Sequence, residues 1–522
     1  MKMPFRRRPR LQELAFFVAC VLALFVVVAF ASEALARPGS GQSYSGSSKS
    51  SSSSKSGSSG DSGSADLIFF LLQICFSYPQ IGIPLLVIAV VVLVISKRKE
   101  GGSDWSTQSA TQAAIRDEID ATGETRATSL RRRLVEALTQ TDPAFSLVVF
   151  EDFAYFLYAE VQRARGEGKI DFLAPYVDER VRAFLRGNGD LRAVSGVIIG
   201  AIYYEDVDVQ SGDGTAENPG FVSVRLVMDV NYVEHARAGG DARFFAKERM
   251  TLVRSLAATS RTPDKVAILA CPNCGAPLSS MRGTTCAHCN TVITPGKKDW
   301  AVQSLEVLER ETRGPLLTSN VDERGTNLPT VFDPQAQAGL AHLSRKDPAF
   351  SWPKLEARTN AIFQNLQAGW TARDPSKVRP FMSDNLFQSQ VYFIEAYRAA
   401  HVVNRLDNSA ITRIELARVS SDAFYDAITL RIHASGLDFT VSEDGKVLSG
   451  SPNKPRQYSE YWTLIRGVRA STKPTDDRAC PNCGAPLQIS MVGNCNYCRA
   501  KVTSGEFDWV LSRIEQDEAY RG

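Results

Sequence analysis

The sequence predicts an α+β fold that occurs twice in the chain, behind an N-terminal region that enters a membrane. Three observations lead to this prediction. Two quartets of cysteines have identical spacing, and the motif Asp-Pro-Ala-Phe-Ser precedes each of them, at Asp142 and Asp347. Helix-like segments come before β-rich segments in both halves of the chain. Two strongly apolar stretches lie near the N-terminus.

The first predicted element is a secretory signal peptide over residues 1–36. A basic start with the sequence FRRRPR precedes an apolar run from Leu14 to Phe30, and an Ala-Leu-Ala sequence of the form that signal peptidase cuts ends at Ala36. The apolar run has seventeen residues, nearly enough to span a bilayer. An uncleaved first membrane anchor is therefore the alternative. In both cases the residues that follow Ala36 leave the cytoplasm.

A Ser/Gly-rich tract over residues 37–66 has too few apolar side chains to offset the entropy lost on ordering, so we expect a disordered, exported linker. The next apolar region, residues 67–96, is broken by polar residues and a proline near its start, and only one transmembrane crossing fits. The basic residues Lys97–Lys99 and the arginine-rich N-terminus both satisfy the positive-inside rule if the chain passes out and back. We therefore expect the bulk of the chain in the cytoplasm, at the inner membrane of a bacterium, with the lipid bilayer as one partner.

Residues 97–126 are polar and predict a cytosolic linker. Leu130, Leu134 and Leu138 then recur every four residues, which predicts an amphipathic helix with the arginines 131–133 on its flank. A leucine stripe at this spacing favours packing into a core. Three arginines close to the membrane also suit contact with anionic lipids. The sequence leaves both interpretations open.

Two stretches, residues 127–260 and 334–470, have the same order of predicted elements, and residues 313–333 link them. Aromatic and aliphatic residues recur at helical spacing in the first part of each stretch. β-rich segments follow, and the best-matched pair is ERMTLVR from Glu248 and EYWTLIR from Glu460. Helices followed by strands predict two α+β domains of about 130 residues, each large enough to hold its own core.

Each domain is followed by four cysteines in two CxxC pairs, with eleven residues between the inner cysteines and an identical start, CPNCGAPL. Four thiolates at this spacing suit a tetrahedral Zn²⁺ ion in a small ribbon. The proline and glycine of CPxCG shape the turn that presents the sulfurs. The predicted ligands of two zinc sites are Cys271, Cys274, Cys286 and Cys289, and Cys480, Cys483, Cys495 and Cys498.

Disulfides or a redox-active CxxC are the alternatives for these cysteines. The other two, Cys20 and Cys75, lie in apolar segments, so the quartets are complete, and a reducing cytosol keeps their thiols free for metal. Because four cysteines fill the coordination shell, we expect structural sites with no catalytic or cofactor-binding residue. Zinc ribbons can also attach to nucleic acid or ribosomes. The net charge of +3 becomes −2 without the five basic residues of the N-terminus, which argues against a nucleic-acid partner.

An Asp-Trp pair follows each quartet, at 299–300 and 508–509. Apolar residues after each pair predict a short helix that the aspartate caps. The first ribbon with its helix covers residues 268–312, and the second ribbon with a C-terminal helix covers 477–522. We expect each tryptophan to pack on its own ribbon, and a partner-binding hot spot is the alternative.

The two domains share further motifs with a known family. These are an opening Asp-x-x-Phe, the sequence DFLAPY from Asp171, VRPFM from Val378, NRLDNSAITRIEL from Asn404 and the closing strand EYWTLIR. With these residues the chain resembles the C-terminal domain of the mitochondrial import inner membrane translocase subunit 44 and its bacterial and mitoribosome-associated relatives. The second domain matches better than the first, which has Met250 in place of the tryptophan. Together they cover about half of the chain.

The resemblance implies a cone in which helices fill the mouth of a curved antiparallel sheet, the nuclear transport factor two-like fold, around an apolar pocket. In the mitochondrial protein this domain tethers a chaperone to a translocation channel, and related domains hold ribosomes at a membrane. It therefore implies a membrane-anchored adaptor or scaffold that docks proteins at the inner membrane, linked to protein translocation or membrane-protein assembly. The protein partners stay unidentified.

The same cone also hosts small-ligand-binding proteins and enzymes, in which a deep aspartate or histidine acts as general base. Strand-like segments offer four such residues, Asp206, Asp208, Asp229 and His433. A strand carboxylate more often faces solvent, and no P-loop or dinucleotide motif occurs in the cytosolic part. We therefore expect a protein that is not an enzyme, with a hydrophobic-ligand or enzymatic cone as the alternative.

Overall fold

The computed structural model describes residues 126–522 except 188–189, 214, 216–217, 313, 315–325, 471–478, 492, 518–519 and 521. The predicted signal peptide, exported linker and transmembrane segment, and all but the last residue of the cytosolic linker, lie outside the described residues. Within the described part, no helix has the length and apolar character needed to cross a membrane.

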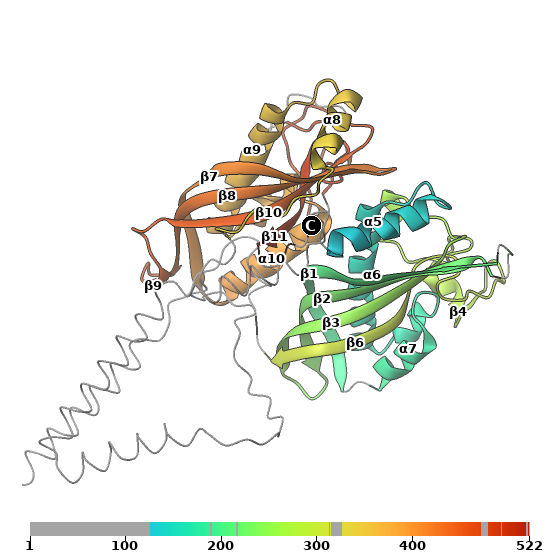
Figure 1. Ribbon diagram of the computed structural model, residues 1–522. Helices are drawn as coiled ribbons and strands as arrows, with labels where there is room; N and C mark the ends of the chain where they lie inside the picture. The colour runs from blue at the N-terminus through green and yellow to red at the C-terminus, as the bar shows by residue number, and fades with distance from the viewer. Residues whose placement is uncertain are drawn as a thin grey trace, which may run out of the picture. The chain divides into compact units, whose positions relative to one another are not determined.

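The first module, residues 126–312, packs three helices against a four-stranded antiparallel sheet (Figure 1). The helices are α5 (Arg126–Thr139), α6 (Leu147–Glu167) and α7 (Glu179–Arg186). The strands, in sheet order, are β1 (Leu191–Ser211), β2 (Gly220–Ala236), β3 (Asp241–Ser255) and β6 (Ala301–Thr312). The aromatic helix α6 contacts β1, and the module's core forms from the helices and one face of the sheet.

The second module, residues 326–522, repeats this order of elements. Its helices are α8 (Ala336–Lys346), α9 (Trp352–Thr371) and α10 (Asp384–Ala399). Its strands are β7 (Val402–Ser421), β8 (Tyr425–Ser442), β9 (Val447–Gly450), β10 (Arg456–Gly467) and β11 (Val510–Gln516), in the order β7-β8-β10-β11 with β9 beside β8. The predicted class of mixed helix and antiparallel sheet is confirmed.

Local sequence explains how the long helix of the first module begins and ends. The side chain of Ser146, the last residue of the repeated motif, accepts a hydrogen bond from Val149 N at 3.2 Å and caps the first turn of α6. Gly168 ends the helix in the left-handed region at φ 69°, which a residue without a Cβ adopts at little cost.

The leucine stripe of α5 packs into the core. Leu134 and Leu138 are fully buried and Leu130 nearly so. Arg131, on the flank of this stripe, is buried as well, with 5% of its surface exposed. The leucines of this helix therefore pack into the core, which is the first of the two interpretations of the sequence. Arg131 is also directed into the protein.

The short helices predicted after the two cysteine quartets are strands. Residues 301–312 form β6 and residues 510–516 form β11, and each pairs with the preceding long strand of its sheet, Met250 opposite Leu305 and Trp462 opposite Ile514. The prediction of helices failed because the periodicity of these short apolar segments does not distinguish a helix from a strand. Each segment becomes a strand because β3 or β10 offers it an edge with free backbone hydrogen-bonding groups.

Because these segments are strands of the sheets, the cysteine units do not follow completed domains. Each unit lies in the connection between the third and fourth long strands of its sheet (β3 to β6, and β10 to β11). The chain therefore leaves the sheet, passes through the cysteine unit, and returns to complete the same sheet. A small hairpin of β4 (Met281–Arg282) and β5 (Thr285–Cys286) lies inside the first unit.

Candidate metal centres and the interface between the modules

All eight predicted cysteines meet in two clusters that could hold a metal ion. Within each quartet the four sulfur atoms lie within 4.8 Å of one another. The Sγ atoms of Cys271 and Cys289 are 3.9 Å apart, those of Cys274 and Cys286 are 3.8 Å apart, and those of Cys480 and Cys498 are 3.8 Å apart. A metal–sulfur bond of about 2.3 Å in a tetrahedron requires sulfur atoms about 3.8 Å apart. The donor set and its spacing therefore fit a four-coordinate ion.

The backbone of each CxxC pair makes the turn that brings two sulfurs together. In the first pair of each quartet a glycine occupies the left-handed region, Gly275 at φ 75° and Gly484 at φ 72°. In the second pair the same place is taken by Asn290 at φ 56° and by Arg499 at φ 65°. Asparagine tolerates this conformation, whereas arginine is strained in it. The second cluster therefore holds its turn at a local cost.

Hydrogen bonds favour the thiolate form at one sulfur of each cluster, Cys289 in the first and Cys498 in the second. The Asn273 side chain donates to Cys289 Sγ at 3.6 Å, and Asn482 donates to Cys498 Sγ at 3.4 Å. Hydrogen bonds from Thr291 and Asn273 lower the pKa of Cys289 to about 5, and the bond from Asn482 is the main cause that lowers the pKa of Cys498 to about 6. One sulfur of each cluster is thus ready as a metal ligand at neutral pH.

A buried ion pair joins the repeated motifs within the first module. Asp142 of the Asp-Pro-Ala-Phe-Ser motif pairs with Arg254, the last residue of ERMTLVR, at 3.0 Å, and both side chains are almost fully buried. The Arg254 guanidinium also lies over the ring of Trp300, 5.4 Å from its centroid. The three motifs therefore meet at one point.

The second module has the same cluster. Asp347 pairs with Arg466 at 2.8 Å, and Arg466 lies 4.8 Å from the ring centroid of Trp509. Sequence reasoning recognised each of these motifs as part of the repeat and missed that they touch. The signal was available, because an Asp, an Arg and a Trp recur together in both copies.

The tryptophans after the quartets belong to the module cores, which corrects both interpretations of them. Trp300 and Trp509 are buried, with 4% and 2% of their surface exposed, and each joins the main core of its own module. Trp300 packs against Phe150 of α6 at 4.6 Å between ring centroids. They neither pack mainly on the cysteine units nor form an exposed hot spot, because the strands that follow them turn their rings inward.

The aspartate beside each tryptophan holds the cysteine unit to the module. Asp299 pairs with Arg261 at 2.6 Å, and Asp508 pairs with Arg358 at 3.3 Å. Each aspartate also accepts a hydrogen bond from the backbone N–H of its tryptophan at 2.8 Å. The two aspartates thus lie just before the first residues of β6 and β11, whereas the sequence predicts that they cap helices.

The four carboxylate and imidazole candidates for a deep catalytic base do not come together. Asp206 and Asp208 lie on β1, Asp229 on β2 and His433 on β8 of the other module. Neighbours of these residues, such as Val207, Met228 and Ile432, point into the cores, so the candidates face the opposite side of their sheets. His433 contacts Glu415 at 3.1 Å, a partner on the adjacent strand.

The two modules, which belong to one compact unit, share a small apolar contact. Val149, near the start of α6, packs with Tyr425 and Ala427 of β8 and with Ile465 and Val510 of the adjacent strands. Ser146, the cap of α6, donates a hydrogen bond to Asp422 at 2.7 Å. The first turn of α6 is therefore the part of the first module that contacts the second sheet.

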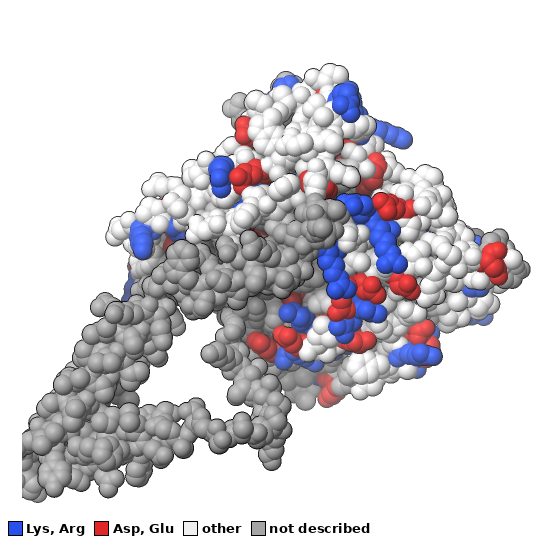
Figure 2. Space-filling view, in the orientation of Figure 1, with Lys and Arg blue, Asp and Glu red and all other residues white. Residues whose placement is uncertain are grey.

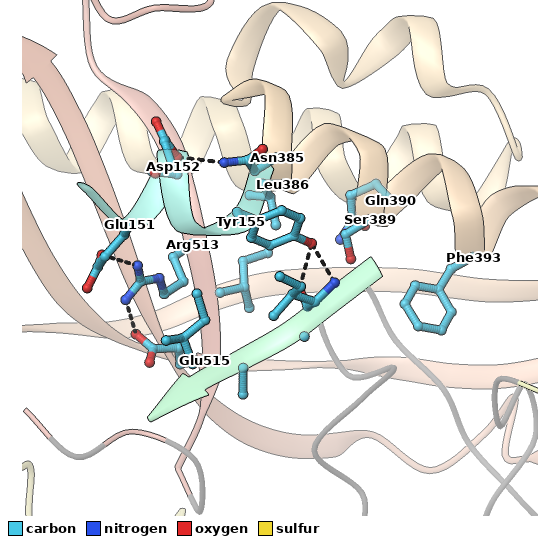
Figure 3. A pocket seen from close by; sticks show the side chains of 16 residues that line it. Glu151, Asp152, Tyr155, Asn385, Leu386, Ser389, Gln390, Phe393, Arg513 and Glu515 are labelled. Carbon is cyan, nitrogen blue, oxygen red and sulfur yellow. Dashed lines mark hydrogen bonds and ion pairs between the residues drawn. The ribbon is translucent and has the colours of Figure 1, made fainter. Parts of the chain in front are cut away.

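Glu151 is the polar centre of this interface (Figure 3). It forms an ion pair with Arg513 of β11, accepts a hydrogen bond from Tyr204 at 2.9 Å, and lies 3.8 Å from Arg131. Although burial opposes ionisation, the charges of Arg513 and Arg131 outweigh it and lower the pKa of Glu151. A charged Glu151 thus joins three elements of two modules.

Asp152, the next residue, has the opposite titration behaviour. It accepts a hydrogen bond from Asn385 of α10 at 2.6 Å (Figure 3). Burial is the main cause that raises the pKa of Asp152 to about 7. A cavity of about 80 Å³ opens beside it, between α6, β1, α10 and β11.

Residues 336–475 match the family described as the Tim44-like domain. The match begins at the first residue of α8 and ends between β10 and the second cysteine cluster. No curated protein matches the chain.

Proposed function

We propose, starting from the Tim44-like domain in residues 336–475, that the protein is a membrane-anchored adaptor that docks proteins at the bacterial inner membrane in support of translocation or membrane-protein assembly. The family match is the observation that carries this proposal, because domains of this kind are associated with translocases and membranes. The predicted signal peptide and transmembrane segment supply the anchor.

The structure supports an adaptor in which two modules act as one surface. The contact around Val149 and the ion pair of Glu151 with Arg513 hold the modules together. The core of the second module is filled by side chains, with Phe363 and Trp462 fully buried and their ring centroids 5.9 Å apart. Surfaces rather than the interior of that module are thus available for recognition.

The two cysteine clusters are proposed to hold structural Zn²⁺. Four thiolates leave no open coordination position, and the ion would stabilise a unit that has few buried apolar residues of its own, such as Ala276 and Ile293 in the first. Such a unit depends on its metal for folding. Because each unit connects two strands of a sheet, zinc would also fix the position at which β6 and β11 begin.

The charged surface is more consistent with protein partners than with nucleic acid. On the face seen in Figure 2, basic side chains lie among acidic ones. Ion pairs such as Arg249 with Glu205 at 2.7 Å and with Glu306 at 3.1 Å neutralise basic groups of the first sheet. Such mixed charge gives little release of counterions from a phosphate backbone.

Topology and crosslinking together test the proposal. A reporter inserted near residue 60 is expected to be active only outside the cytoplasm, and a reporter at the C-terminus only inside it. In membranes, photo-crosslinkers at exposed positions of both modules, such as Phe184 and Val447, are expected to give the same protein adducts, which a variant lacking residues 1–99 loses. A C-terminal reporter active outside, or adducts that do not depend on the anchor, would refute it.

A further inference from the structure

Hydrogen bonds connect a serine, a histidine and an aspartate in series on the sheet of the first module. Ser195 lies on β1, His235 near the end of β2 and Asp241 at the start of β3. The Oγ of Ser195 is 2.7 Å from Nε2 of His235. The Nδ1 of His235 is 2.6 Å from Oδ1 of Asp241. The sequence motifs do not reveal this cluster, because Ser195 and His235 are 40 positions apart.

The register of the sheet places the three side chains on one face. His235 is directly opposite Asp241. Ser195 is opposite Val233, which shares its side of the strand with His235 because the two are two residues apart. This face lies away from the core, into which the alternate residue Tyr232 points. Ser195 and Asp241 are exposed and His235 is partly exposed, so a molecule in solution can reach the serine.

The Asp241 carboxylate sets the proton arrangement of a neutral His235. An ionised carboxylate only accepts hydrogen bonds, so Nδ1 of His235 carries the proton and donates it to Oδ1. The Nε2 atom then accepts the hydrogen bond from Ser195 Oγ and is able to take its proton. A hydroxyl beside a base that a third group orients is the arrangement that activates serine for acyl transfer on several unrelated folds.

The backbone next to Ser195 departs from a regular strand. The register of β1 with β2 shifts between Ser195 and Ile198, and Gly196 and Val197 have no opposite partner in it. Gly196 has a φ of 57°, in the left-handed region that glycine adopts at little cost. A bulge of this kind redirects a side chain and interrupts the ladder. The N–H groups of the bulge are therefore the nearest donors for the negative oxygen of a tetrahedral intermediate at Ser195.

Apolar side chains lie beside the same bulge. The ring of Tyr392 in α10 comes within 3.3 Å of the position that a Cβ on Gly196 would occupy, and a methyl group of Val233 comes within 3.8 Å of it. These two side chains offer an apolar surface for the acyl part of a substrate next to Ser195.

We propose that Ser195, His235 and Asp241 form a hydrolytic site for carboxylic esters. Ser195 Oγ attacks the ester carbonyl carbon while Nε2 of His235 takes the hydroxyl proton. The bond from this carbon to the alcohol oxygen breaks, and His235 returns the proton to the departing alcohol. Water then cleaves the acyl-serine by the same route, which releases a carboxylic acid and restores the hydroxyl. Asp241 is a positioning residue that acts through His235. This activity goes beyond the adaptor role and involves neither cysteine cluster.

A fluorescent fluorophosphonate, which phosphonylates an activated serine and releases fluoride, tests the nucleophile. The full chain in a non-ionic detergent is expected to carry the label at Ser195, located by mass spectrometry of its peptides. Ser195→Ala should remove this label, and His235→Gln should slow its formation by about 100-fold or more because the base is lost. Ser211→Ala, at another exposed serine of β1, is the matched control and should be labelled like the wild type.

Should Ser195→Ala fail to fold, Ser195→Gly takes its place. Absence of the label from Ser195 in the wild type, or an equal rate of labelling in His235→Gln, overturns the proposal.

Hydrolysis of p-nitrophenyl butyrate tests the role of Asp241. In Asp241→Asn the amide group can donate to Nδ1 and so favours the other tautomer of His235. We expect kcat to fall by about tenfold or more with KM unchanged. Asp241→Glu keeps a carboxylate and should recover part of the lost rate, whereas a merely structural aspartate would leave kcat unchanged in both variants. Equal hydrolysis by the wild type and Ser195→Ala would also overturn the proposal.

Discussion

At the scale of single residues, the most informative feature is the buried pair of Asp142 and Arg254 and its counterpart, Asp347 with Arg466. Each pair joins the start of the first long helix to the end of the third long strand, and an aromatic ring lies against each arginine. Breaking a buried pair leaves one charge without compensation, which costs about 3–5 kcal/mol, whereas an exposed pair contributes about 1 kcal/mol or less.

We expect Asp142→Ala to lower the free energy of unfolding by about 3–5 kcal/mol, because Arg254 stays buried without the carboxylate that compensates its charge. Asp347→Ala should cost less, since Arg466 keeps Asp426 at 3.9 Å. Urea unfolding of the full chain measures both. Asp171→Ala is the control, because this aspartate is 58% exposed in its pair with Arg182, and it should cost at most about 1 kcal/mol. Equal losses for Asp142→Ala and Asp171→Ala would contradict the buried-pair assignment.

Arg499, in the second cysteine unit, has a backbone conformation that favours glycine. Its φ of 65° is strained for a residue with a Cβ, and its side chain is exposed. Arg499→Gly is expected to stabilise the second cysteine unit by about 1 kcal/mol, read as a higher chelator concentration needed to unfold it. Asn496→Gly is the control in the same turn, where φ is not positive, and should give no gain. A loss of stability in Arg499→Gly would show that the backbone strain is not relieved.

At the scale of elements, the return strand after each cysteine cluster links that cluster to its sheet. The link is closest in the second module. Lys501 of the second unit pairs with Asp384 at 2.6 Å, and the neighbouring Asn385 donates to Asp152 of the first module. β11 begins soon after the same unit and carries Arg513, the partner of Glu151. The second unit therefore supports two elements of the interface.

We expect replacement of the second quartet, Cys480, Cys483, Cys495 and Cys498, by serine to speed hydrogen exchange in β11 and in the first turn of α10. A metal ion held by the four cysteines would also set where these elements begin. The same change in the first quartet is the matched control. It should speed exchange in β6 and leave β11 and α10 at wild-type rates. Wild-type exchange in β11 without the second quartet would contradict this coupling.

At the scale of the whole molecule, the contact between the modules depends on the charge state of two adjacent carboxyl groups. Glu151 is held ionised by two arginines, whereas burial raises the pKa of Asp152 to about 7 from an ordinary value near 3.8. The folded protein therefore binds the Asp152 proton more tightly than the unfolded chain does. Its contribution to stability is present below about pH 4 and is lost as the pH rises to about 7.

Asp152→Asn is expected to remove this loss. The amide keeps an oxygen to accept the hydrogen bond from Asn385, and it carries no charge at any pH. In urea unfolding the variant should exceed the wild type by roughly 1–3 kcal/mol at pH 8 and match it near pH 4. Asp208→Asn, at an exposed position of the same module, should show no such dependence. A constant difference between Asp152→Asn and the wild type at all pH values would contradict the titration.

Features that depend on residues close together in the chain could be predicted from the amino-acid sequence. The spacing and turn residues of the CxxC pairs predicted both four-sulfur clusters, because the backbone of each turn places its two sulfurs. The helical periodicity of the aromatic residues predicted the long helices α6 and α9, and the second domain carried the motifs of the family that residues 336–475 match.

Features that depend on residues far apart in the chain could not be predicted in this way. The segments after the quartets are strands because β3 and β10 offer unpaired edges, and their tryptophans are buried because those strands join the sheets. The interface at Glu151 likewise depends on residues several hundred positions apart. A short apolar segment or a single charge has no preferred partner in the sequence, so the packing of two complete modules was needed to assign one.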